Sequence, residues 1–192
     1  MGDGEALKIA IDLLHVPARV PKVRAEPLPQ GVSLLLRIAA DDHEALTTAV
    51  WTLDRTPATI RDAATFFIEQ ALLCPEADSY RVLGATPATS SSELRRNMAL
   101  LIRWLHPDSN PSGRRSVFVN RITRAWDDLK TPERRAAYDQ ERSARDQEKS
   151  AGSHLGRPRR RPRKPALPLN KDPSGDGLFR RALAFLRGGK KR

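Results

Sequence analysis

Residues 91–129 read SSELRRNMALLIRWLHPDSNPSGRRSVFVNRITRAWDDL, and this stretch decides the fold. Its first and last thirds carry apolar residues every three or four positions, which is the period of an amphipathic helix. The middle, residues 106–113, is rich in Pro, Ser, Asn and Gly, which favour turns. The stretch therefore predicts two helices joined by a short loop, and helices connected in this way pack antiparallel.

Hydroxyl residues and apolar stripes define these helices. Ser91 and Ser92 are expected to cap the first, which runs to about Leu105. Its predicted core stripe is Leu94, Met98, Leu101, Ile102 and Leu105. The second helix spans about 115–129, with the stripe Val119, Ile122, Ala125, Trp126 and Leu129. Thr131 and Pro132 open a short last helix through Tyr138, because proline suits a first helical position.

The segment before this hairpin also predicts helices. A short helix is expected over residues 5–16, and prolines at 17, 21, 27 and 29 then suggest an extended connector. Residues 31–74 form a predicted helical module, with helix starts at Val32, at Asp41–Asp42 and at Thr56–Pro57. The stripe of its last helix is Ile60, Ala63, Ala64, Phe67, Ile68, Ala71 and Leu72. The fold class that follows is all-α.

Four short motifs stand in order along residues 78–140. The first, residues 78–84, reads DSYRVLG; His106-Pro107-Asp108 follows the first hairpin helix directly; residues 122–129 read ITRAWDDL; residues 131–139 read TPERRAAYD. They resemble, respectively, the D-Y-Y-x-x-L-G, HPD, I-x-x-A-Y-x-x-L and D-P-x-K-R-x-x-Y-D motifs of the J domain of DnaJ (Hsp40) co-chaperones. The tripeptide alone is a weak signal, whereas four ordered motifs are a strong one.

The resemblance implies a four-helix J domain that docks on the nucleotide-binding domain of an ATP-loaded Hsp70 (DnaK-type) partner. It stimulates ATP hydrolysis there and has neither an active site nor a cofactor of its own. The residues expected to bind Hsp70 are His106, Pro107, Asp108, Asn110, Arg95, Arg96 and Arg103. In this hypothesis Asp108 presents its carboxylate to a cation, Pro107 restricts the backbone, and His106 holds the loop on the hairpin. Basic side chains provide long-range attraction to an acidic partner.

Several positions depart from the family pattern. Ala99, Leu100 and Ser109 stand where the family often has basic residues. The resemblance therefore does not fix how strongly this domain binds Hsp70. Val119 replaces a common Phe and Trp126 a common Tyr, and both are expected to fill the core. The sequence has no Gly/Phe-rich linker after the J-like segment and no Cys-x-x-Cys repeat. We therefore expect a divergent class C member, in which the regions outside the J domain choose the client or the location.

Leu100 and Trp104 lie one turn apart, beside the basic face and outside the predicted stripe. One interpretation is that the helical module 31–74 covers this pair and thereby masks the Hsp70-binding surface. Deleting residues 1–74 would then raise ATPase stimulation. The alternative is that the two side chains are scattered surface apolar residues, which are normal on proteins.

The net charge of +11 lies entirely in the last quarter of the chain. Residues 1–140 carry 18 basic and 18 acidic residues, whereas residues 141–192 carry 16 and 5. This tail is expected to be disordered. Its polybasic run offers six cations to nucleic-acid phosphates or anionic lipids: Arg157, Arg159, Arg160, Arg161, Arg163 and Lys164. The alternative is a solvated linker. Residues 177–187 predict a short amphipathic segment for an anionic membrane or a partner protein.

Other classes of protein and site are not supported. The single cysteine, Cys74, excludes an internal disulfide, and His15, His43 and His154 lack metal-ligand spacing. No apolar run approaches the roughly 18 residues that span a bilayer, and the N-terminus lacks a basic signal region. We expect a cytoplasmic protein, with membrane-peripheral contact through the tail as the alternative.

The expected organisation has four parts. These are an N-terminal helix with connector at 1–30, the helical module at 31–76, the J domain at 77–141 and the basic tail at 142–192. Two functions compete for the whole protein. The first is an Hsp70 co-chaperone, and the second is a nucleic-acid- or membrane-associated scaffold whose J-like domain no longer activates Hsp70. The intact tripeptide at 106–108 favours the first.

Overall fold

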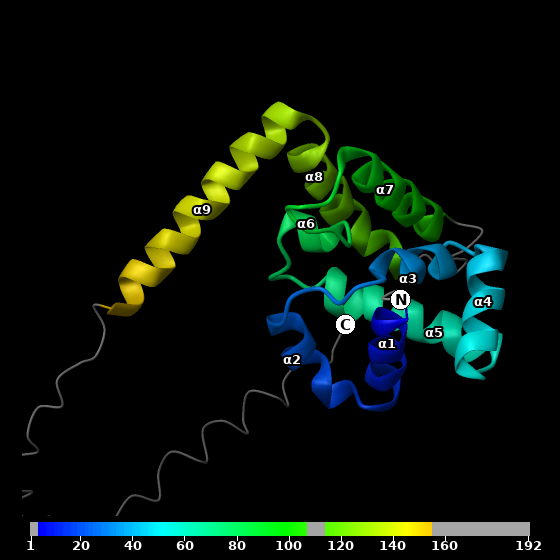
Figure 1. Cartoon of the computed structure of the whole chain (residues 1–192). Coiled ribbons are helices and arrows are strands. Elements are labelled where there is room, and N and C mark those ends of the chain that lie inside the picture. Colours follow the sequence, from blue (N-terminus) through cyan, green and yellow to red (C-terminus); the bar gives the residue numbers. More distant parts are fainter. Residues whose placement is uncertain (1–3, 107–113, 155–192) are drawn as a thin grey trace, which may run out of the picture. The chain divides into compact units, whose positions relative to one another are not determined.

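The computed structural model describes residues 4–106 and 114–154, and every regular element in these ranges is a helix (Figure 1). The prediction of an all-α fold is therefore confirmed. The N-terminal helices are α1 (Glu5–His15), η1 (Pro17–Arg19), α2 (Val20–Ala25), α3 (Val32–Ala39), α4 (His43–Leu53), α5 (Pro57–Phe67) and the π-helix η2 (Ile68–Leu72). The later ones are α6 (Ser79–Val82), α7 (Ser91–Leu105), the 3-10 helix η4 (Arg114–Phe118), α8 (Val119–Leu129) and α9 (Pro132–His154).

Side-chain caps begin several helices, largely where the sequence predicts them. Asp42 accepts a hydrogen bond from the Ala45 backbone N–H at 3.1 Å, and Thr56 accepts one from that of Thr59 at 3.2 Å. The cap of α7 is Ser90, one residue earlier than predicted. Ser90 is the cap because the Glu93 carboxylate accepts a hydrogen bond from the Ser90 backbone N–H. This bond completes a reciprocal capping box.

The prolines between α1 and α3 do not produce a fully extended connector. Pro17 opens the 3-10 helix η1, and Pro21 stands in the first turn of α2. Both positions lack an intrahelical partner for a backbone N–H, so proline costs little there. Only Pro27 and Pro29 lie in non-helical backbone, and the prediction is wrong for residues 17–25.

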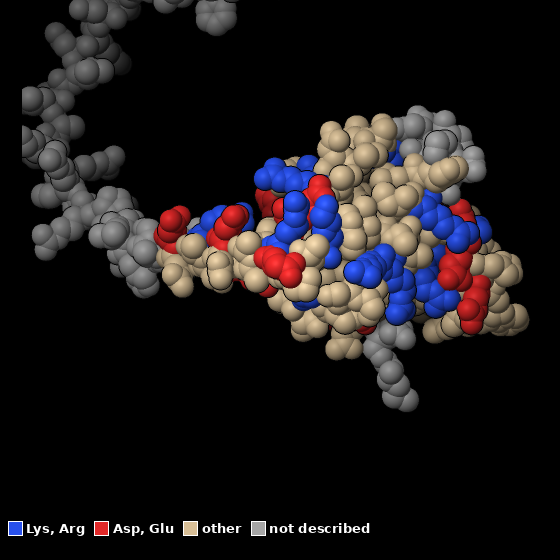
Figure 2. Space-filling view, turned by 90° about the horizontal axis from the view of Figure 1, so that it is seen from above, with Lys and Arg blue, Asp and Glu red and all other residues tan. Residues whose placement is uncertain are grey.

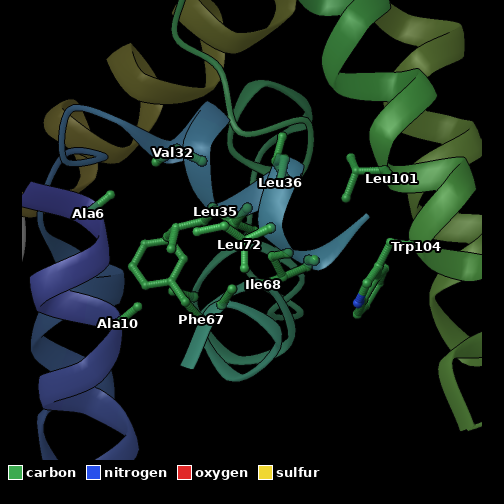
Figure 3. Close-up of a cluster of buried hydrophobic side chains, with 14 of the residues drawn as sticks. Ala6, Ala10, Val32, Leu35, Leu36, Phe67, Ile68, Leu72, Leu101 and Trp104 are labelled. Atoms are coloured by element: carbon green, nitrogen blue, oxygen red, sulfur yellow. The ribbon is translucent and has the colours of Figure 1, made fainter. Parts of the chain in front are cut away.

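One hydrophobic core joins the N-terminal helices to the later ones. Phe67, Ile68 and Leu72 stand at its centre beside Leu35 and Leu36 of α3, with α1 on one side and Leu101 and Trp104 of α7 on the other (Figure 3). α5 packs against α1 and α3, α3 packs against α7, and α8 packs against α6 and α7. Residues 1–152 are accordingly one compact unit, while the four-part division of the chain stays a prediction.

The buried face of α7 differs from the predicted stripe. Leu94 and Leu101 are buried as expected, but Ile102 is 46% exposed. Asn97 and Trp104, which were not predicted to be buried, are 5% and 1% exposed. The reason is that α7 packs against two helices, α8 and α3. Its buried face is therefore rotated about the helix axis from the face expected for packing against α8 alone.

The last helix is longer than predicted. α9 continues from Pro132 to His154, so the expectation of disorder is wrong for residues 142–154. The polybasic run and the segment 177–187 lie outside the described residues.

Candidate functional site

One face of α7 presents arginines to solvent. Arg95, Arg96 and Arg103 are exposed, and their spacing of seven or eight residues places them on one side of the helix. Ala99 lies exposed between them. Lys and Arg side chains gather in patches on the face of the molecule that Figure 2 shows, which is seen from above. The three predicted basic residues are thus accessible to a partner.

This basic face leads directly into the candidate loop. His106 caps the C-terminal end of α7, is exposed, and donates its backbone N–H to the Arg103 carbonyl at 3.1 Å. Pro107, Asp108 and Asn110 lie outside the described residues. The chain is described again from Arg114, where η4 begins.

Contacts between residues just outside the loop hold its two ends. The Trp104 ring is stacked with Phe118 at a centroid distance of 6.1 Å, and the Arg115 guanidinium lies 4.7 Å from the Trp104 ring centroid. Arg115 Nη1 also donates to the Trp104 carbonyl at 3.1 Å. Because both partners of Trp104 belong to η4, these contacts fix the separation between the last turn of α7 and the first turn after the loop.

A polar network closes the opposite end of the hairpin. The Tyr80 hydroxyl donates to Asp139 at 2.8 Å and accepts from Arg135 Nε at 3.0 Å. Ser79 donates its backbone N–H to the Tyr138 hydroxyl at 2.8 Å and its own hydroxyl to Asp128 at 2.6 Å. Burial raises the pKa of Tyr80, and the bond to Asp139 raises it further, so Tyr80 stays a neutral donor. Residues of three of the predicted motifs thus meet.

Comparison with known proteins agrees with this geometry. The family model of the DnaJ domain matches residues 78–139. Residues 78–139 are a DnaJ domain. The chain is 38% identical over 66 residues to a chaperone protein DnaJ of Orientia tsutsugamushi (strain Ikeda), an alignment that covers 34% of this chain and 18% of that protein. It is 35% identical over 71 residues to the DnaJ homolog subfamily C member 16 of Gallus gallus, covering 36% and 9%.

The chain therefore spans less than a fifth of the length of these curated relatives. No solved structure matched it. In the ranges 4–106 and 114–154 no helix is long and apolar enough to cross a membrane. These same ranges hold no cluster of three or more His, Cys, Asp or Glu side chains suited to a metal ion.

The DnaJ domain is joined closely to the N-terminal helices through Arg81. Its Nε, Nη1 and Nη2 donate to three backbone carbonyls outside the domain, those of Ala71 at 2.9 Å, Glu26 at 3.0 Å and Val23 at 2.7 Å. Burial lowers the pKa of Arg81. Gly84 adds close backbone packing, since a Cβ built there would lie 2.9 Å from Val32 Cγ1.

The two interpretations of Leu100 and Trp104 can now be compared. Trp104 is 1% exposed and Leu100 is half-buried against the core, so they are not scattered surface residues. The N-terminal helices do cover this side of α7, as the first interpretation requires. Arg95, Arg96 and Arg103 nevertheless remain exposed, so the cover does not mask the basic face of the DnaJ domain.

Of the two residues that stand where the family has an aromatic residue, Val119 and Trp126, only Trp126 packs as predicted. Val119 is 41% exposed and does not fill the core. Its neighbour Phe118 packs on Trp104 instead, because η4 turns that residue inward. Trp126 is half-buried and packs against the core of the DnaJ domain, as predicted.

Proposed function

We propose that this protein is a J-domain co-chaperone that docks on an ATP-loaded Hsp70 and stimulates its ATPase. The observation that carries the proposal is an exposed arginine face on α7 that is followed directly in the sequence by His106-Pro107-Asp108, within a DnaJ domain. The protein adds no catalytic group, because hydrolysis takes place in the Hsp70 nucleotide site.

The two parts of the surface have different roles in this proposal. Arg95, Arg96 and Arg103 attract an acidic patch on Hsp70 and set the encounter rate and orientation, since rim charges act mainly on association. Asp108 then makes the specific contact by presenting its carboxylate to a cation on Hsp70. Pro107 and His106 hold that carboxylate in place, and Asn110 extends the contact.

The regions outside the DnaJ domain would define a class C co-chaperone. The curated relative from Gallus gallus carries a subfamily C name, and the match to it covers 36% of this chain. In this proposal the basic residues at 157–164 direct the protein to an anionic surface or polymer, with a cytoplasmic location. The client is selected by residues outside 78–139.

The experiment that tests the proposal is a steady-state ATPase assay with a purified DnaK-type Hsp70. The wild-type chain is expected to raise the hydrolysis rate, whereas Asp108→Asn keeps the side-chain shape and removes the charge, so stimulation is lost. Asp127→Asn is the matched control, because Asp127 lies on the surface and pairs with Lys130 at 2.7 Å, and it should stimulate like the wild type. Equal stimulation by Asp108→Asn and the wild type would overturn the assignment.

A further inference from the structure

An ionic contact connects the N-terminal helices to both ends of the candidate loop. Glu69, in the π-helix η2, has its Oε1 atom 3.8 Å from Nε of Arg115. Arg115 in turn donates to the Trp104 carbonyl and covers the Trp104 ring. The three residues therefore link a helix outside the DnaJ domain to the residues just before and just after the loop.

These side chains are partly shielded from water. The exposed fractions of the Arg115 and Glu69 side chains are 20% and 30%, and Trp104 is 1% exposed. Charges in such an environment are less screened than surface charges. An arginine suits this position because its planar group stacks on an aromatic face while its N–H groups bind elsewhere.

Arg115 has a large part in fixing the position of Trp104. The indole Nε1 of Trp104 is buried and has no hydrogen-bond partner within residues 4–106 and 114–154. The ring is therefore held by packing, against the hydrophobic core and Phe118, and by the guanidinium of Arg115. Loss of the Arg115 orientation would release one side of this ring.

We propose that Glu69 and Arg115 are positioning residues for Hsp70 activation. Trp104 lies two residues before His106, and Arg115 lies two residues after Gly113, so their contact joins the described residues on either side of the loop. Glu69 orients Arg115 and thereby makes the N-terminal helices part of the activating machinery. This inference rests on the proposed co-chaperone function and deepens it.

The structure provides a matched set of variants. Glu69→Gln removes the negative charge that faces Arg115, and Arg115→Lys keeps the positive charge but loses the planar group that covers Trp104. Arg121→Gln is the control. Arg121 also connects the DnaJ domain to the N-terminal segment, donating to the Leu73 carbonyl from α8 rather than from the end of the loop. Thermal unfolding of the full chain is measured for all three variants.

The readout is Hsp70 ATPase stimulation as a function of the concentration of this protein. Glu69→Gln and Arg115→Lys are expected to lower the maximal stimulated rate about fivefold, which corresponds to about 1 kcal/mol. The half-saturating concentration should change less than about twofold, because the basic face of α7 that sets the encounter is untouched. Arg121→Gln should keep the wild-type maximum.

Hydrogen exchange gives a second measurement without Hsp70. Amides at residues 104–106 and 115–118 should exchange faster in Glu69→Gln than in the wild type. A wild-type maximum and wild-type exchange in Glu69→Gln would overturn the inference, as would an equal loss of maximal stimulation in Arg121→Gln. A wild-type chain that does not stimulate Hsp70 would overturn the proposed function itself, and that result is read before any variant is compared.

Discussion

At the scale of single residues, the buried positions of α7 carry a sequence signal, whereas the ionic contact between Glu69 and Arg115 does not. Asn97 lies three residues after Leu94 and four before Leu101, so helical spacing alone places it on the buried side. The link from Glu69 to Arg115 leaves no such signal, because an ion pair between distant segments creates no periodicity. The exposed arginines of α7 were predictable, since they lie opposite the apolar stripe.

Asn97→Ala tests the value of the polar group inside this face. Asn97 Nδ2 donates to the carbonyls of Leu83 at 3.0 Å and Gly84 at 3.2 Å. Alanine leaves buried acceptors unpaired, so the free energy of unfolding should fall by about 1–3 kcal/mol in urea denaturation. The exposed change Ala99→Ser on the same helix should cost less than about 0.5 kcal/mol. Similar losses in the two variants would contradict this role of Asn97.

At the scale of elements, helix starts were more predictable than helix ends. A hydroxyl or carboxylate followed by proline or by a polar first turn is a local signal, and Thr56 and Asp42 follow it. The C-terminal half of α9 has no apolar stripe to reveal it. Local bonds such as that from the Ser143 hydroxyl to the Asp139 carbonyl at 2.9 Å accompany this helix. Its extension past Tyr138 was therefore missed.

Ser90→Ala tests the capping box of α7. Removing the cap is expected to lower stability by about 1 kcal/mol. Hydrogen bonds from the Ser90 side chain and backbone lower the pKa of Glu93. Because the pKa of Glu93 is lower in the folded state, its contribution to stability is complete at a pH above its unfolded-state pKa. That contribution is lost as the pH falls through its folded-state pKa. The difference between wild type and Ser90→Ala in urea denaturation should thus be full at pH 7 and shrink in acid. A difference that grows in acid would contradict the capping box.

At the scale of the whole molecule, the DnaJ domain shares one hydrophobic core with the N-terminal helices. Motif matching identifies residues 78–139 correctly, but it treats them as a separate body. The structure instead packs α3 on α7 and anchors Arg81 on carbonyls of the N-terminal segment. Composition could not show this, since contacts between segments depend on shape rather than on charge. Deleting residues 1–74 should for this reason expose Trp104 and reduce stimulation rather than raise it.

Leu36→Ala tests whether residues 4–152 unfold cooperatively. Leu36 belongs to α3, is 1% exposed, and its Cδ1 would lie 3.3 Å from a Cβ built on Gly84 of the DnaJ domain. Truncating a buried leucine costs about 2–5 kcal/mol. In a shared core, that loss should appear in native-state hydrogen exchange of α8 amides, which lie outside the N-terminal helices. Val16→Ala, at a side chain that is 46% exposed, should leave α8 unchanged. Loss of protection confined to α1–α5 would show that the DnaJ domain unfolds independently.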